Sequence, residues 1–376
     1  MIVLKILFVL CLVQCLINGN SLLFNRFASD TDEEVVDRWI TQPLDHFNCS
    51  DKRTWSMRYK ENFVFSKNNS LIFIMIGGQG PITNEYLKNG LMYDIGVKHG
   101  GIMYYVEHRF YGKSRPTEDM STNNLKYLNT KQTLRDLQFF IETKKKEYNL
   151  QNSRIILFGC SYAGNLAVAL YKRFPGILGI LASSAPIHVK LDFYEYYESV
   201  AKVLRTYNEN CSESVKTAFA LAEKLFTTQN GLKTLKSLFN LCDVPKYPLD
   251  RAHFMKILAQ EFANAVQYDQ IKDGQTKIAA LCNKMMENLT FAPLQRLAYI
   301  FWQKSYCNDV SYNNYVNKYR EISWDSPIDM SINRLWYYQK CTEYGYFQMI
   351  SNNTVFGTSA PLSYFVTLCN DLFDIQ

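Results

Sequence analysis

The chain has 376 residues, of which 47% are apolar and 15% aromatic, so it can bury a large core and form one sizeable domain with an insertion. Its formal net charge of +6 is spread thinly, and the one tight basic cluster, Lys144-Lys145-Lys146, lies in a stretch with helical periodicity. That distribution is typical of a solvated helix face and gives no sign of a nucleic-acid partner.

The first 20 residues predict a secretory signal peptide. They hold a lone Lys5, an apolar run over residues 6–17 and a small residue at Gly19, in the order that such leaders show. A membrane anchor is the alternative, but the run is shorter than the roughly 20 residues of a spanning helix. We therefore expect a soluble mature protein with no membrane partner.

Strands and helices alternate in the first half of the chain. Residues 71–76 (LIFIMI) and 101–107 (GIMYYVE) predict buried strands, and a long amphipathic helix is expected over residues 131–148. Residues 154–175 (RIILFGCSYAGNLAVALYKRFP) predict another strand that runs straight into an apolar-faced helix, followed by a strand at 179–184. Such alternation predicts a parallel sheet covered on both faces.

Ser161 stands between that strand and its helix, in the string GCSYAG. A direct strand-to-helix turn strains the central residue and projects its hydroxyl, as in the G-x-S-x-G nucleophile elbow, although Ala163 replaces the last glycine. The Tyr162 amide, at the helix N-terminus, can face a developing oxyanion. The alternative is that Ser161 is an ordinary helix N-cap.

A glycine-rich loop, GGQGP, follows the strand at 71–76. An α/β-hydrolase places its second oxyanion-hole amide in such a loop, which makes Gly78 and Gln79 the candidates. The alternative is a simple glycine turn.

From about Thr41 to its last residues, the chain resembles the family of prolyl carboxypeptidase, dipeptidyl peptidase II and thymus-specific serine protease, most of all the thymus-specific branch. Four ordered strings carry the resemblance: GGQGP, EHRFYGKSRP, FGCSYAGNLAVALYKRFPGILGILASSAPIHVKLDFYEY and CTEYGYFQ. It implies an α/β-hydrolase with an inserted all-helical cap, acting as a serine exopeptidase, often beside proline. It further implies peptide substrates, neither cofactor nor metal, and it allows a homodimer.

Successive helices are expected after Pro186, among them 198–207, 214–227, 250–266 and 278–289. The expected domains are a signal peptide (1–20), an α/β-hydrolase core (21–190), a helical cap (191–350) and the start of a return to the core (351–376).

Eight cysteines remain beyond the leader, none in a C-x-x-C spacing that would suggest zinc, so disulfides and an oxidising compartment are expected. Cys160, beside the serine, is interpreted as a packed free thiol. Sequons predict glycosylation at Asn48, Asn68, Asn210, Asn288 and Asn352, which favours an extracellular or lysosomal location.

The rest of a catalytic triad is harder to place. An α/β-hydrolase orders its triad Ser, Asp or Glu, then His, and only His188 and His253 follow Ser161. In the resembling family the acid and base follow the cap, and here the sequence stops at Gln376 before either motif. We expect a truncated gene model or splice form with an incomplete sheet and little activity. The alternatives are a pseudoenzyme that binds peptides or a partner, and a rearranged site using His188 or His253.

The other candidate polar residues are given structural roles or none. Glu107, His108 and Arg109 of EHRFYG are expected to form a hydrogen-bonded cluster that supports the active-site face. Asp309, Asp325 and Asp371 follow Ser161 in the chain, but without a following histidine none is assigned as the triad acid.

Overall fold

The computed structural model describes residues 35–67, 70–272, 274–287, 290–301, 306–351 and 353–375; the signal peptide expected over 1–20 lies outside them. The chain forms two compact units. We call residues 1–188 and 322–339 the sheet unit, and residues 189–321 and 340–376 the helical unit.

The elements of the sheet unit are β1 (Arg38–Pro43), β2 (Thr54–Asn62), β3 (Leu71–Ile76), η1 (Glu85–Leu87), α2 (Gly90–His99), β4 (Ile102–Val106), α3 (Thr122–Leu125), α4 (Thr130–Glu147), β5 (Arg154–Cys160), α5 (Tyr162–Arg173), β6 (Ile177–Ser183) and α13 (Ile328–Gln339). Those of the helical unit are β7 (Lys190–Asp192), α6 (Glu195–Tyr207), α7 (Glu209–Leu225), α8 (Gln229–Leu238), α9 (Pro248–Gln267), β8 (Ile271–Lys272), β9 (Gln275–Thr276), α10 (Lys277–Met286), α11 (Pro293–Phe301), α12 (Tyr312–Tyr319), η2 (Lys340–Tyr344), β10 (Gly345–Phe347) and α14 (Leu362–Phe373).

Six strands form one sheet in the order β1-β2-β4-β3-β5-β6. The pairs β4–β3, β3–β5 and β5–β6 are parallel, whereas β1–β2 and β2–β4 are antiparallel. The expected strands and the long helix are present with boundaries shifted by at most two residues. The α/β class and the parallel sheet are therefore confirmed, with an antiparallel extension that the sequence reading did not include.

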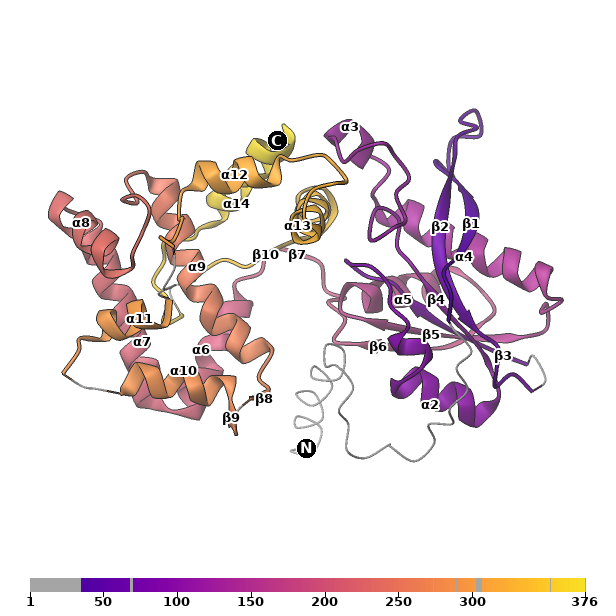
Figure 1. Ribbon diagram of the computed structural model, residues 1–376, viewed down its shortest axis with the longest axis horizontal. Helices are drawn as coiled ribbons and strands as arrows, with labels where there is room; N and C mark the ends of the chain where they lie inside the picture. The colour runs from indigo at the N-terminus through magenta and orange to yellow at the C-terminus, as the bar shows by residue number, and fades with distance from the viewer. Residues whose placement is uncertain are drawn as a thin grey trace. The chain divides into compact units, whose positions relative to one another are not determined.

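Helices cover both faces of this sheet, as the alternation of side chains along β4 requires. Met103 and Tyr105 pack in one cluster with Met92 of α2. Tyr104, between them, points to the other face and meets Phe140 of α4 with ring centroids 5.3 Å apart. Figure 1 shows α2 and α4 on opposite sides of the strands.

Strand β2 was missed because its sequence, TWSMRYKEN, looks polar. Arg58 and Lys60 are nevertheless buried, since Arg58 pairs with Glu107 at 2.5 Å and Lys60 with Asp37 at 2.7 Å. A buried charge is tolerated when it is paired in this way, so a strand pattern based on apolar residues fails here.

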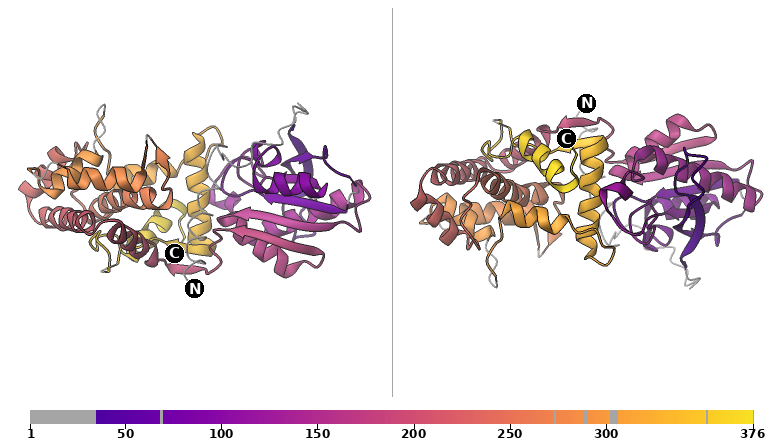
Figure 2. Two further views of the ribbon diagram at one scale, coloured as in Figure 1. Left: turned by 90° about the horizontal axis from the view of Figure 1, so that it is seen from below. Right: turned by 90° about the horizontal axis from the view of Figure 1, so that it is seen from above.

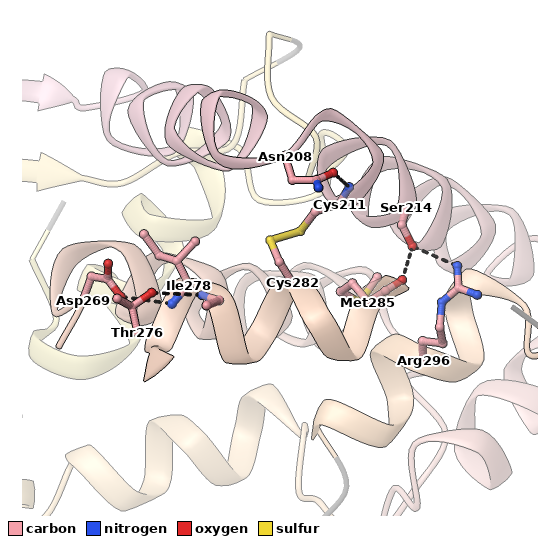
Figure 3. The surroundings of a disulfide bond; sticks show 10 residues. Asn208, Cys211, Ser214, Asp269, Thr276, Ile278, Cys282, Met285 and Arg296 are labelled. Carbon is pink, nitrogen blue, oxygen red and sulfur yellow. Dashed lines mark hydrogen bonds between the residues drawn. A yellow bond between two sulfur atoms is a disulfide. The ribbon is translucent and has the colours of Figure 1, made fainter. Parts of the chain in front are cut away.

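The helical unit has its own core, built mainly from α6, α7, α9, α10 and α11, and Figure 2 shows these helices from two further directions. Among its described residues, three disulfides cross-link it: Cys211–Cys282, Cys242–Cys307 and Cys341–Cys369. They confirm the expectation of disulfides. Figure 3 shows the first, which joins α7 to α10 beside the Asn208 cap and the hydrogen bond from Ser214 Oγ to the Met285 carbonyl.

The contact-based units differ from the expected domains in two stretches. Residues 322–339 group with the sheet unit, and residues 351–376, including α14, group with the helical unit. The second grouping follows from the disulfide between η2 and α14 and from the packing of α14 on α12. Grouping by contacts does not test which segments fold as domains, so the four expected domains stay predictions.

Candidate active site

Ser161 lies at the turn between β5 and α5. Its φ is 54° and its ψ −127°, a conformation that residues other than glycine adopt rarely and at a cost of about 1–3 kcal/mol. The residue is exposed, and its side chain makes no capping hydrogen bond to α5. The strand–turn–helix arrangement is thus confirmed, and Ser161 stands at the N-cap position of α5 without the side-chain hydrogen bond of an ordinary N-cap.

The backbone around Ser161 holds this strained conformation in place. A Cβ added at Gly159 would lie 2.3 Å from the Ala163 carbonyl oxygen, so only glycine lets strand and helix approach this closely. The Ser161 amide donates to the Ser183 carbonyl at 2.9 Å, which ties the turn to β6. That amide is therefore already used, and the next amide, that of Tyr162, stays the predicted oxyanion donor.

The glycine loop after β3 lies against the start of α5. The Gly77 amide donates to the Val106 carbonyl at 2.8 Å, and a Cβ on Gly77 would lie 2.6 Å from that oxygen. A Cβ on Gly78 would meet the Ala163 methyl at an ordinary 3.7 Å, so the loop passes close to the alanine that replaces the last elbow glycine. The oxyanion-hole roles of Tyr162, Gly78 and Gln79 stay predictions.

Cys160, immediately before Ser161, is disulfide-bonded. The interpretation of Cys160 as a packed free thiol is therefore wrong. Cys49, by contrast, is free and exposed. Adjacency to the serine gave no information about this pairing.

No hydrogen bond joins the Ser161 hydroxyl to any residue that the structure describes, and those residues include all five histidines. His188 is exposed. His253 lies buried on α9 in the helical unit, where its Nδ1 pairs with the Tyr364 hydroxyl at 2.7 Å, and burial lowers its pKa to about 3. Neither histidine is held as a base for Ser161 by a hydrogen bond.

Glu107 is the centre of a buried polar cluster beside the loops that follow β3 and β4. Its carboxylate accepts hydrogen bonds from the Arg58 guanidinium, from the Ser114 hydroxyl and from the backbone amides of Ile82 and Lys113. These contacts tie the loop after β4 to β2 and to the segment after the glycine loop. The carboxylate therefore has hydrogen-bond partners for its buried oxygens, as a structural role requires.

Arg109 and Asp136 form a second buried pair. The guanidinium donates to both carboxylate oxygens, at 2.5 and 2.8 Å, and His46 Nε2 lies 2.7 Å from the same carboxylate. Burial alone would raise the pKa of Asp136, but Arg109 outweighs it and lowers that pKa below its ordinary value. With the Glu107 contacts, this pair confirms the expected structural cluster in EHRFYG.

His108 is also fully occupied. Its Nδ1 lies 2.6 Å from the Arg109 carbonyl, and its Nε2 lies 3.0 Å from the Tyr162 hydroxyl and 3.1 Å from Thr133 Oγ1. Burial lowers its pKa to about 4, so the ring is neutral at pH 7. A cavity of about 10 Å³ beside it has room for one water at most.

Gln339, at the end of α13, completes these contacts and was missed by the sequence reading. Its amide bonds the Tyr162 hydroxyl at 2.7 Å and the Tyr111 hydroxyl at 2.6 Å. Its one local signal is that it stands two residues before CTEYGYFQ. That string carries the family resemblance and gives no sign of a contact with the elbow.

Three acidic residues that follow Ser161 in the chain make no hydrogen bond to it within the part of the chain that the structure describes. Asp371 accepts from the Tyr312 hydroxyl at 2.7 Å, and Asp309 accepts from the Ser311 amide at 2.9 Å. Asp325 is exposed. None of them can be assigned to Ser161.

Two of the five sequon asparagines, Asn48 and Asn210, lie on exposed positions. Asn68, Asn288 and Asn352 lie outside the described residues. A search of the described helices for a stretch long and apolar enough to cross a bilayer finds none.

Known proteins similar to this chain are named as serine proteases or as a carboxypeptidase, in agreement with a serine at a strand-to-helix turn. The chain is 36% identical, over 95% of its length and 72% of the relative's, to a Caenorhabditis elegans protein named as a serine protease. It is 26% identical to the thymus-specific serine protease of Mus musculus over 90% of this chain and 70% of the relative. It is 30% identical to the lysosomal Pro-X carboxypeptidase of the same species over 57% of this chain and 47% of the relative. Since residues 42–376 match the serine carboxypeptidase S28 family, the chain belongs to this family of serine peptidases.

Proposed function

We propose that this chain is a serine exopeptidase that cleaves proline-containing peptides by acyl transfer through Ser161. The observation that carries the proposal is the backbone of Ser161, whose φ of 54° holds an exposed hydroxyl at a strand-to-helix turn. Strain of this kind is retained where a side chain must be presented in one direction.

In the proposed reaction the Ser161 oxygen attacks the peptide carbonyl while a base accepts the hydroxyl proton. The Tyr162 amide and that of Gly78 or Gln79 hold the oxyanion of the tetrahedral intermediate. The intermediate collapses, and the amine leaves with a proton returned by the base. Water then hydrolyses the acyl-enzyme and restores the Ser161 hydroxyl.

A second candidate function is peptide binding without turnover. It is favoured by one observation, that none of the five histidines is hydrogen-bonded to Ser161. Without a base the serine keeps close to its free reactivity, and catalysis falls by orders of magnitude. In this alternative the chain holds peptides or a partner such as a second copy.

The location proposed for the chain is the secretory pathway, with an extracellular or lysosomal destination. The three described disulfides support this, because such bonds persist in oxidising compartments. The exposed asparagines at 48 and 210 are the described positions at which glycans would be attached.

The test is fluorophosphonate labelling of the secreted full chain, together with assays on proline-containing peptides. Ser161→Ala should abolish labelling and lower turnover by at least about a thousandfold. Ser56→Ala, an exposed serine on β2, is the control and should change neither. Labelling that persists in Ser161→Ala would overturn the nucleophile assignment, whereas peptide binding with no labelling in the unaltered chain would favour the second function.

A further inference from the structure

We infer that Gln339 is a positioning residue for the proposed active site, because its side-chain amide fixes the ring of Tyr162 and with it the backbone amide next to Ser161. The inference rests on the proposed function only for its catalytic consequence. The tether itself is a property of the sheet unit, to which every residue involved belongs.

The tether is a chain of buried hydrogen bonds. Tyr111 and Gln339 are fully buried, Tyr162 is 1% exposed and His108 3%, so water does not compete for these contacts. Tyr162 lies with its ring centroid 5.5 Å from that of His108 and 5.5 Å from that of Trp336. The ring is therefore confined by packing and by polar contacts together.

The directions of the hydrogen bonds follow from the donors present. His108 Nδ1 faces a carbonyl, that of Arg109, and must donate to it. Nε2 of the neutral ring is then an acceptor. Thr133 Oγ1 lies 3.1 Å from the Asn129 carbonyl, to which it can give its proton, so the Tyr162 hydroxyl is assigned as the donor to Nε2.

Gln339 supplies a donor for the Tyr162 hydroxyl oxygen and an acceptor for the Tyr111 hydroxyl. Its NH2 group donates to the Tyr162 hydroxyl oxygen, and its carbonyl oxygen accepts the Tyr111 hydroxyl proton. A primary amide offers a donor and an acceptor at the same position, which a carboxylate or a hydrocarbon cannot do. The residue type at 339 is thus set by the hydroxyls on either side of it.

The consequence for chemistry comes from the position of Tyr162 in the chain. It is the first residue of α5 and directly follows Ser161, so a shift of its ring that carried Cα along would also turn the backbone amide proposed for the oxyanion hole. An oxyanion develops only in the transition state, and a misdirected donor therefore lowers the rate of acylation more than it weakens substrate binding.

The experiment compares Gln339→Leu and Gln339→Glu with Arg334→Met in the full chain. Arg334 lies on the same helix, is also buried and donates to the Met120 carbonyl, so its loss disturbs α13 by another route. We expect both Gln339 variants to lower the maximal rate of fluorophosphonate labelling by about tenfold or more with an unchanged half-saturating concentration. Arg334→Met should not show this separation.

A double-mutant cycle with Tyr162→Phe tests the route of the effect. If Gln339 acts through Tyr162, the Gln339→Leu/Tyr162→Phe double variant should label about as fast as Tyr162→Phe alone. Independent, multiplying losses would overturn the inference.

Amide hydrogen exchange of residues 159–166 separates this inference from the proposed function, because it needs no activity. Exchange should be faster in both Gln339 variants than in Arg334→Met. Unchanged exchange would overturn the tether, even in an active enzyme. Faster exchange in a chain that never labels would support the tether while the nucleophile assignment failed.

Discussion

The backbone of Ser161 lies in a region of φ that only glycine adopts without steric cost, so its neighbours must hold it there. Gly159 contributes most directly, since its missing side chain leaves room for the Ala163 carbonyl. The amide of Ser161 and the Ser183 carbonyl fix the other side of the turn. The elbow therefore depends on a glycine that never touches substrate in the proposed reaction.

Replacement of that glycine gives the first residue-scale prediction. Gly159→Ala puts a methyl group 2.3 Å from the Ala163 oxygen, so α5 must shift away from β5. We expect a loss of about 1–3 kcal/mol in the free energy of unfolding by urea and a larger relative loss of serine labelling. Gly179→Ala on β6, where an added Cβ meets nothing within 4 Å, should be neutral or slightly stabilising. Equal effects of the two changes would contradict the steric account.

His253 gives a prediction about pH. Burial, assisted by Lys256, lowers its folded-state pKa to about 3, against about 6.5 in an unfolded chain. Between these values the unfolded state binds the extra proton, so the free energy of unfolding falls as the pH falls. From pH 6.5 to pH 4 this one group should remove about 3 kcal/mol.

Urea unfolding followed at pH 7, 5.5 and 4 measures that slope. His253→Gln, which cannot titrate, should flatten it, and His188→Gln, at an exposed histidine, is the control variant. An unchanged slope in His253→Gln would show that other groups carry the pH dependence. His108, with a pKa of about 4 for the same reason of burial, is expected to contribute in the same direction.

At the scale of elements, β2 and α13 show how charged or amide side chains decide packing. Strand β2 is inside the sheet because Arg58 and Lys60 meet acidic partners from elsewhere in the chain. Helix α13 joins the sheet unit through polar contacts, among them Arg334 with the Met120 carbonyl at 3.0 Å and Gln339 with two tyrosines. Neither element shows this role in its own sequence.

The disulfide between α7 and α10 carries a prediction for the helical unit. It links residues 71 apart, and the closure of a loop of that length restricts the unfolded chain by about 4 kcal/mol in the chain-entropy account. Cys211→Ser with Cys282→Ser should lower the free energy of unfolding by about 2–4 kcal/mol. Calorimetry or denaturant unfolding of the oxidised chain measures this.

Cys49→Ser is the matched control for that experiment, since Cys49 is free and exposed and its loss should leave the unfolding transition in place. A double variant as stable as the control would mean that the packing of α7 on α10, and not the disulfide, fixes the two helices.

At the scale of the whole molecule, the chain builds two units that are interleaved in sequence. It leaves the sheet unit after residue 188, forms most of the helical unit, and returns to the sheet unit for residues 322–339. The return is secured by the hydrogen bonds of Met120 with Ile322 and of Trp324 with the Thr117 carbonyl. The proposed elbow thereby receives support from residues far along the chain.

The sequence by itself determined the features whose signals are local. The buried strands β3, β4, β5 and β6, the helix α4 and the turn at Ser161 follow from apolar periodicity and from glycines within a few residues of one another, and short-range sterics make such patterns specific. The family resemblance was also confirmed, because the ordered strings that carry it are local patterns as well. Disulfides were expected from the predicted oxidising compartment, although their pairing was not.

Only the tertiary structure decided which polar residues are inside the molecule and what they do there. Arg58 is hydrogen-bonded to Glu107 across a sequence separation of 49 residues, and Gln339 to Tyr162 across one of 177. A charge or amide is stable inside a protein only when such a partner is present, and nothing in the neighbouring sequence records that partner. The support behind the elbow could not be predicted from the sequence for this reason, because it consists of contacts between distant segments.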